Sequence, residues 1–218
     1  MINFDKIKGA IFDLDGTLID SMQMWTYVEA EYLVRLGITP SAELSKEVHK
    51  MGQLEIGEYF RTHYGVKKTA QEITDEKNAM MEVCYYEKAE IKPGVIPVLE
   101  ALRLRGVKMC IATQTDRYLA EAGLKRLALS GYFERIFTGG EENTSKNRPD
   151  IFITAAKFLG TKVEETVVFE DALHAVTSAK GAGFPVVAVF DQAAAARQEE
   201  IKKLADKYYY SFEELEIK

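Results

Sequence analysis

The second half of the chain alternates short apolar runs with amphipathic stretches of helix length. Each apolar run is rich in β-branched residues and is closed by polar or turn residues, which is typical of buried strands. The strands predicted in this way are 107–113, 135–139, 166–170 and 186–190, with a late edge strand at 207–211. Between them, segments such as 117–129 and 150–160 place apolar residues at three- and four-residue spacing. This βα repetition predicts a parallel sheet with helices on both faces.

The first half has a different pattern. An apolar run at 8–13 predicts one more strand of the same sheet, but residues 21 to 90 show no convincing strand. They contain four amphipathic segments that glycines stop, at 24–37, 42–52, 54–65 and 70–90. We therefore expect an α/β fold: a Rossmann-like parallel sheet core flanked by helices, with an inserted all-α helical cap domain. The expected core is 1–16 with 93–218, and the expected cap is 17–92.

Composition places the chain among ordinary globular proteins. Of its 218 residues, 47% are hydrophobic and 28% are charged, and the formal net charge is -6. No run of Lys or Arg forms a basic stripe, so we expect no nucleic-acid partner. We also expect no membrane partner, because no window approaches the roughly 20 apolar residues of a membrane span.

Cysteine usage and the N-terminus both indicate a cytoplasmic protein. The two cysteines, Cys84 and Cys110, form no CxxC pair and lie in a helical pattern and a buried strand pattern. We interpret both as reduced core residues. The N-terminal residues lack the basic start and long apolar stretch of an export signal.

Chemically active side chains gather where the predicted strands end. Asp13 and Asp15 follow the first strand, Thr113 and Gln114 follow the second, and Glu170 and Asp171 follow the run at 166–170, with Lys146 in an intervening loop. The carboxyl ends of parallel strands lie along one edge of a sheet, so these residues are expected to share one pocket.

Several carboxylates in one pocket predict a bound cation, because their mutual repulsion makes joint ionisation costly. A set of oxygen ligands without histidine or cysteine favours a hard ion such as Mg²⁺. The histidines His49, His63 and His174 are scattered along the chain. We expect none of them to bind the metal.

Each of these features also has an ordinary explanation when taken alone. Asp-Gly after a strand is common turn chemistry, a loop lysine is usually solvated, and Glu170-Asp171 could cap the following helix. Their combination favours a functional site. Trp25 and Tyr32, at helical spacing, are interpreted as core of the cap rather than substrate contacts.

Four motifs resemble those of the haloacid dehalogenase superfamily. They are "DLDGT" at 13–17, "ATQT" at 112–115, "SKNRPD" at 145–150 and "FEDALHAVTSAKGAG" at 169–183, in the family's order and spacing. The helical insertion after the first motif is similar to the C1-cap subfamily, which includes proteins like β-phosphoglucomutase and phosphoglycolate phosphatase. The resemblance covers the whole chain.

The resemblance implies a role for each matching residue. Asp13 would be a nucleophile that forms an aspartyl-phosphate, and Asp15 would be the general acid and base. Thr113 and Lys146 would complete the catalytic set. The implied metal contacts are Asp13, Asp15, Glu170 and Asp171, with Glu170 either a direct ligand or an acceptor beside the ligands. The implied substrate contacts are Thr113, Gln114 and Lys146.

Among the family's reactions, we expect a Mg²⁺-dependent phosphatase. Asp15 argues against a dehalogenase, which needs no acid for an alkoxide leaving group. Relatives similar to β-phosphoglucomutase have a valine at the position of Thr17, a histidine at the position of Trp25, and an arginine and serine where this chain reads "MGQLEIG". Two alternatives remain open: a sugar phosphomutase, and a catalytically idle binding protein on the same fold.

The substrate is expected to be a small phosphorylated metabolite. Its contacts in the cap are expected at 51–54 and at 22–25, whose apolar character suggests a small organic phosphate. We expect a monomer or weak dimer.

Overall fold

Six parallel strands form the centre of the protein. The computed structural model describes residues 2–48, 51–142 and 144–217. Its strands are β1 (Gly9–Phe12), β4 (Lys108–Thr113), β5 (Ile136–Thr138), β6 (Thr166–Glu170), β7 (Val186–Val189) and β8 (Lys207–Tyr209). They lie in the order β5-β4-β1-β6-β7-β8, and every neighbouring pair is parallel. The expected parallel sheet is confirmed, including the edge strand near the C-terminus.

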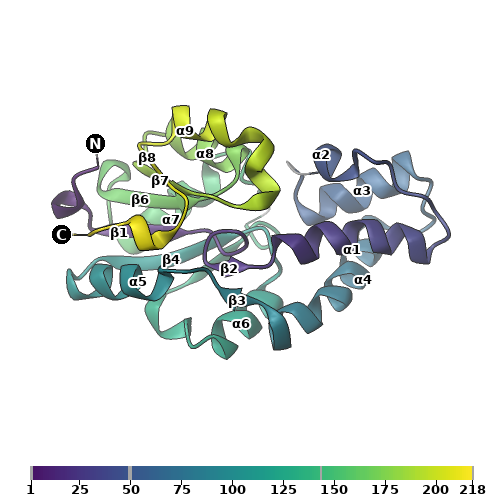
Figure 1. Ribbon diagram of the computed structural model, residues 1–218, viewed down its shortest axis with the longest axis horizontal. Coiled ribbons are helices and arrows are strands. Elements are labelled where there is room, and N and C mark those ends of the chain that lie inside the picture. Colours follow the sequence, from purple (N-terminus) through teal and green to yellow (C-terminus); the bar gives the residue numbers. More distant parts are fainter. Residues whose placement is uncertain (1, 49–50, 143, 218) are drawn as a thin grey trace.

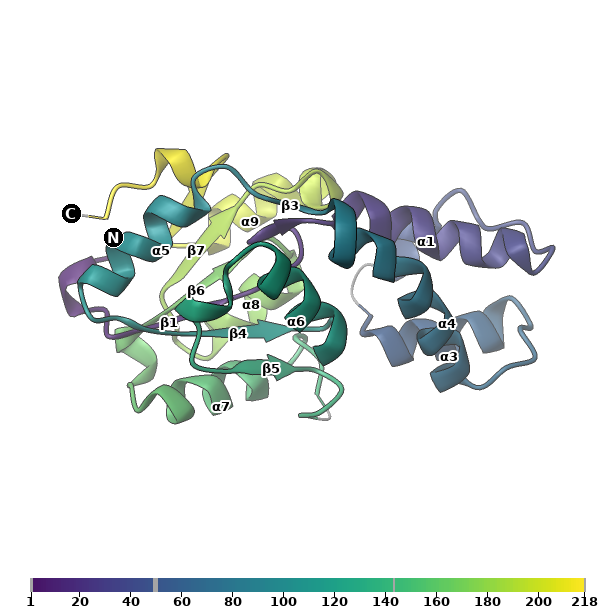
Figure 2. The same cartoon turned by 90° about the horizontal axis from the view of Figure 1, so that it is seen from below.

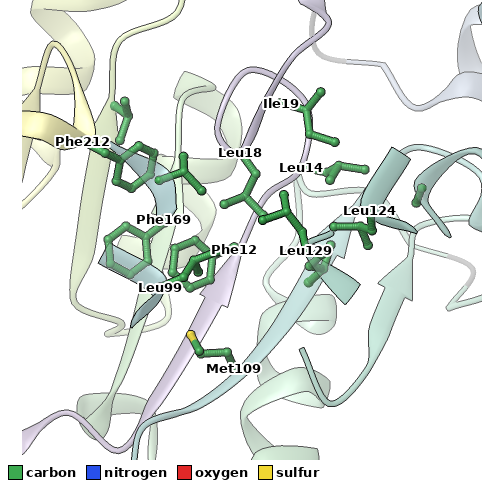
Figure 3. Packing of buried hydrophobic residues seen from close by; sticks show 14 of the residues in the cluster. Phe12, Leu14, Leu18, Ile19, Leu99, Met109, Leu124, Leu129, Phe169 and Phe212 are labelled. Atoms are coloured by element: carbon green, nitrogen blue, oxygen red, sulfur yellow. The ribbon is translucent and has the colours of Figure 1, made fainter. Parts of the chain in front are cut away.

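Helices cover both faces of this sheet (Figure 1). On one face lie α5 (Val95–Leu104) and α6 (Arg117–Arg126), and on the other lie α7 (Asp150–Leu159), α8 (Leu173–Gly181) and α9 (Gln198–Leu204). Side chains alternate between the faces along each strand. Phe12 packs with the first layer and Ile11 with the second. The ring of Phe12 stacks on that of Phe169 with centroids 4.3 Å apart, and Leu99 of α5 lies beside the two rings (Figure 3).

The insertion after β1 is helical, as expected. It contains α1 (Met22–Arg35), α2 (Leu44–Val48), α3 (Gln53–His63) and α4 (Ala70–Val83), which pack around a small apolar core of their own. Tyr32 lies in that core, as predicted. These helices form one end of the molecule, and both termini lie at the opposite end (Figures 1 and 2). The predicted helix at 42–52 is shorter than expected, and His49 and Lys50 lie outside the described residues.

Two features of the connections to the insertion were not predicted. Short strands β2 (Ile19–Asp20) and β3 (Glu90–Ile91) pair antiparallel, so the outgoing and returning chains run side by side. A π-helix over Cys84–Lys88 continues α4 and closes with the Ala89 N–H donating to the Cys84 carbonyl at 2.8 Å. Two-residue strands and a single π-turn carry no hydrophobic period, so sequence patterning does not detect them.

The remaining elements are short, and the cysteines are internal. Short 3-10 helices occur at Phe4–Lys6, Ser130–Tyr132, Val163–Glu165, Gln192–Arg197 and Phe212–Glu214. Cys84 and Cys110 are buried and unbridged, in agreement with their interpretation as core residues. Within the described ranges, no helix combines the length and apolar content needed to cross a membrane.

Candidate functional site

The seven predicted site residues line one cavity at the carboxyl end of β1. In the sheet, β1 lies between β4 and β6, and the chain proceeds outward from β1 in both directions. A crevice therefore opens beyond β1, where the strand order reverses. The cavity has a volume of about 130 Å³, and its lining includes Asp13, Asp15, Thr113, Gln114, Lys146, Glu170 and Asp171.

The turn after β1 brings this strand's end close to that of β6. Gly16 has a φ of +85°, a conformation that favours glycine, and its N–H donates to the Ile19 carbonyl at 2.9 Å. A Cβ atom at position 16 would lie 2.7 Å from Asp171 Oδ2. Thr17 Oγ1 donates to Asp171 Oδ1 at 3.0 Å. The Gly-Thr pair thus lets the turn approach Asp171 and also orients its carboxylate.

Lys146 connects the nucleophile candidate to the end of β6. Its Nζ contacts Asp13 Oδ1 and donates to Glu170 Oε1 at 2.6 Å. Burial alone would lower the pKa of Lys146, but the carboxylates of Asp13 and Glu170 raise it above its ordinary value. Burial raises the pKa of Asp13 to about 6, against the opposing effect of Lys146. Lys146 is therefore held cationic beside Asp13.

Three carboxylates in this cavity form a candidate metal centre. Ligand oxygens of Asp13, Glu170 and Asp171 all lie within 4.8 Å of one another, and all three residues are buried. Burial and the neighbouring carboxylates raise the pKa of Asp171 well above its ordinary value. One lysine cannot neutralise three carboxylates, so this oxygen-only cluster fits a hard divalent cation.

The two histidines in the described part of the chain are not part of this cluster. His63 lies on the exposed surface of the insertion, and His174, at the start of α8, lines the cavity. His49 falls outside the described residues. Where the chain is described, the carboxylate cluster includes no histidine.

Asp15 is surrounded by hydroxyl groups. Ser21 Oγ donates to its Oδ1 at 2.5 Å, Thr115 Oγ1 donates to its Oδ2 at 2.7 Å, and the Tyr85 hydroxyl also donates to Oδ1. Burial and the charge of Asp13 raise the pKa of Asp15, while these hydrogen bonds oppose the shift. A raised pKa lets a carboxyl group keep its proton to a higher pH than an ordinary aspartate does, which suits a general acid.

Comparison with known proteins agrees with this geometry. The family model described as haloacid dehalogenase-like hydrolase matches residues 7–183. The chain belongs to the haloacid dehalogenase-like hydrolases. The resemblance inferred from the four motifs is thereby confirmed.

Individual relatives of this haloacid dehalogenase-like hydrolase align over most of its length. Hexitol phosphatase A of Escherichia coli K12 is 29% identical over 97% of this chain and 94% of its own. A phosphorylated carbohydrates phosphatase of Thermotoga maritima is 28% identical over 81% of this chain and 82% of its own. The structure of CbbY from Rhodobacter sphaeroides in complex with phosphate superposes with a TM-score of 0.85, at 25% identity and 96% coverage of both chains.

The helical insertion of this hydrolase contributes its own side of the cavity. Met22, Trp25, Met51 and Gln53 line it, from the two segments in which cap contacts were expected. Trp25 was interpreted as core of the cap, although 22–25 was also expected to contact the substrate. It packs in the main apolar cluster and also lines the cavity.

Two charged residues of the insertion were missed by sequence reasoning. Glu29 on α1 is buried and lines the cavity, and Lys77 on α4 is fully buried and donates to Gln53 Oε1 at 2.8 Å. Burial lowers the pKa of Lys77 to about 8, with the Glu29 carboxylate opposing the shift. Neither residue belongs to a motif, and charged residues on amphipathic helices are normally solvated, so no sequence signal identified them.

Gln114 lies where the cavity that contains the carboxylates meets a larger cleft. That cleft, of about 800 Å³, lies between the insertion and the sheet and shares Gln53 and Gln114 with the smaller cavity. A Cβ atom at Gly139 would lie 2.5 Å from Gln114 Oε1, and one at Gly52 would lie 3.0 Å from it, so the Gln114 side chain lies against both glycines. Among the described residues its buried Nε2 has no hydrogen-bond partner, so this donor is available to a ligand.

Proposed function

We propose that this hydrolase is a Mg²⁺-dependent phosphatase that acts on a small phosphorylated metabolite through an aspartyl-phosphate on Asp13. The observation that carries the proposal is the buried group of Asp13, Asp171 and Lys146 at the carboxyl end of β1, with Asp15 in the same cavity. The names of its relatives, hexitol phosphatase and phosphorylated carbohydrates phosphatase, support a sugar or polyol phosphate as the substrate class.

In the first step, a carboxylate oxygen of Asp13 attacks phosphorus and the bond from phosphorus to the leaving oxygen breaks. Asp15 gives its proton to that oxygen, so a neutral alcohol departs. In the second step, water attacks phosphorus, passes a proton to Asp15, and the bond to Asp13 breaks. Inorganic phosphate leaves, Asp13 is again a carboxylate and Asp15 again carries its proton.

The other residues of the cavity reduce the charge repulsion between a carboxylate and a phosphate. Lys146, held cationic, neutralises charge on Asp13 and on the transferring phosphoryl group. Thr113 and the Gln114 amide would donate hydrogen bonds to phosphoryl oxygens. The chain therefore supplies both cationic and neutral donors.

The carboxylate cluster fits Mg²⁺, but its three carboxylates have different hydrogen-bond partners and would not contribute equally to the metal. Glu170 already accepts Lys146 through Oε1, and through Oε2 the N–H groups of Asp171 and Ala172, at 3.0 and 3.1 Å. We therefore assign the metal to Asp13, Asp171 and the Asp15 backbone carbonyl, with Glu170 fixing Lys146 and the loop. Bound Mg²⁺ would supply additional positive charge against the substrate phosphate.

The phosphomutase alternative is disfavoured by Trp25. Its indole Nε1 donates to the Tyr85 hydroxyl at 2.9 Å, and an indole N–H is a donor only, so Trp25 cannot relay a proton as histidine does. The idle-binding alternative would leave the complete set of nucleophile, acid and lysine without a purpose.

We also propose that 17–92 acts as a cap over a core of 1–16 and 93–218, excluding water from the reaction.

The proposal is tested by phosphate release from a panel of hexose, hexitol, glycerol and nucleoside phosphates, with Mg²⁺ and with chelator. Wild type is compared with Asp13→Asn and with a control, Asp20→Asn, at an exposed carboxylate of β2. We expect release that requires Mg²⁺, disappears in Asp13→Asn and persists in Asp20→Asn. Isomerised hexose phosphate without release would replace the proposal by the mutase. No turnover of any compound would contradict it.

A further inference from the structure

Tyr85 is a fully buried tyrosine whose hydroxyl lies at the centre of the contacts around Asp15. It donates to Asp15 Oδ1, accepts the Trp25 Nε1 proton at 2.9 Å and lies 3.4 Å from Thr115 Oγ1. The two steps proposed above do not use this residue. Its hydroxyl therefore connects the proposed acid, Asp15, to Trp25 on a helix of the insertion.

A π-turn and a neighbouring glycine position the Tyr85 ring. Tyr85 lies in the π-turn after α4, and such single turns alter the direction of side chains relative to a continuous α-helix. Arg126 of α6 fixes this turn by donating through Nε to the Tyr85 carbonyl at 2.9 Å and by contacting the Ala89 carbonyl. On α6, a Cβ at Gly123 would lie 3.0 Å from Tyr85 Cδ1, so the glycine makes room for the ring.

The direction of each hydrogen bond follows from the groups involved. The Trp25 N–H can only donate, so the Tyr85 oxygen accepts it and the phenol proton points to Asp15 Oδ1. Ser21 donates to that same oxygen at 2.5 Å. Oδ1 is thus occupied by two donors. Among the described residues, the Thr115 hydroxyl is the one hydrogen-bond partner of Oδ2. This hydroxyl can rotate from donor to acceptor, so Oδ2 is the oxygen able to carry a transferable proton.

We propose that Tyr85 is a positioning residue that fixes the orientation of the Asp15 carboxyl group and, through Trp25, links that orientation to helix α1 of the insertion. The inference rests on the proposed phosphatase function. Ser21 lies on the outgoing connection, Tyr85 on the returning one, and Thr115 follows β4. The Asp15 carboxyl group is therefore aligned only when both connections and the end of β4 hold their places around it.

The test compares Tyr85→Phe with a matched control, Tyr86→Phe, which changes the exposed tyrosine of the same π-turn. Two substrates separate the roles of Asp15: p-nitrophenyl phosphate, and the alkyl phosphate that wild type turns over fastest. Nitrophenolate leaves without protonation, so its first release needs no acid, whereas an alkoxide needs one. Stopped-flow measurement gives the first-turnover rate, and steady-state assays give kcat and KM.

For Tyr85→Phe we expect kcat on the alkyl phosphate to fall at least about tenfold with KM within about twofold. The first release of nitrophenolate should stay within about twofold of wild type, followed by slower steady turnover because Asp15 also acts on water. Tyr86→Phe should match wild type. Trp25→Phe removes the hydrogen-bond donor to Tyr85 and should show a weaker form of the same pattern. It replaces Tyr85→Phe in the test if that variant does not fold.

Three results would overturn the inference. Unchanged kcat in Tyr85→Phe would show that the hydroxyl is dispensable, and an equal loss in nitrophenolate release and alkyl phosphate turnover would show a general structural defect. If Tyr85→Phe does not fold, wild-type kinetics in Trp25→Phe would contradict the link. These results differ from failure of the proposed function, in which wild type itself shows no phosphate release that depends on Asp13.

Discussion

Thr17 Oγ1 lies 3.0 Å from Asp171 Oδ1, so a hydroxyl in the turn after β1 orients a carboxylate at the end of β6. Thr17 and Asp171 are both buried. Hydrogen-bond donors behind a metal ligand fix its direction and typically change metal affinity by about 10–100-fold.

Thr17→Val removes this donor with little change in volume. We expect Mg²⁺ affinity, measured from the Mg²⁺ dependence of phosphate release, to weaken about tenfold. We also expect the variant to remain a phosphatase, although valine is the residue of the mutase pattern, because Trp25 still cannot relay a proton. Thr177→Val on the exposed face of α8 is the control. Unchanged Mg²⁺ affinity would show that the Thr17 contact does not orient a metal ligand.

A comparison of Gly16 with Gly37 separates backbone strain at a left-handed position from contact between the new side chain and its neighbours. Gly16→Ala incurs strain at a φ of +85° and places its Cβ against Asp171. Gly37→Ala incurs similar strain at +74°, but apart from its chain neighbours no atom of the described residues lies within 4 Å of its Cβ. We expect both variants to lose about 1–2 kcal/mol in free energy of unfolding, and only Gly16→Ala to lose Mg²⁺-dependent activity. Equal activity in the two variants would contradict the close approach at Asp171.

The buried Lys77 makes stability depend on pH in a defined window. Its pKa is about 8 in the folded protein against 10.5 as the ordinary value. Between these values the unfolded chain binds more protons, so the contribution of Lys77 to the free energy of unfolding rises with pH, by up to about 3 kcal/mol. Below pH 8 the group is charged in both states and this contribution is constant.

Urea denaturation of wild type and Lys77→Met from pH 7 to about 9.5 measures this effect. We expect the wild-type free energy of unfolding to rise relative to that of Lys77→Met above pH 8. Lys67→Met, at an exposed lysine before α4, should follow wild type throughout. Parallel curves for wild type and Lys77→Met would mean that the pKa of Lys77 is not lowered in the folded protein.

The sheet, and the meeting of the predicted strand-end residues in one cavity, could be predicted because they depend on the order of the strands and their hydrophobic period. Parallel strands place their carboxyl ends at one edge, so Asp13, Thr113 and Glu170 meet although long segments separate them. The role that we propose for Glu170 could not be predicted. It depends on the two N–H groups and the lysine that surround its oxygens.

The residues that prediction missed act through tertiary contacts. Tyr85 reaches Asp15 only because a π-turn and the small Gly123 place its ring there, and neither condition is visible as a hydrophobic period. Lys77 has the sequence character of a solvated helical lysine. Its burial follows from the packing of α3 against α4, which the amphipathic pattern predicts only in outline.

The most direct test of the central claim is to trap the phosphoryl group on Asp13. Asp15→Asn lacks the base for the second step, so mixing it with Mg²⁺ and p-nitrophenyl phosphate and quenching in acid should accumulate the intermediate. We predict that peptide mass spectrometry finds one phosphoryl group on the peptide containing Asp13. The double variant Asp13→Asn, Asp15→Asn should carry none. Nitrophenolate release without a phosphorylated peptide, or a phosphoryl group on another residue, would contradict the account.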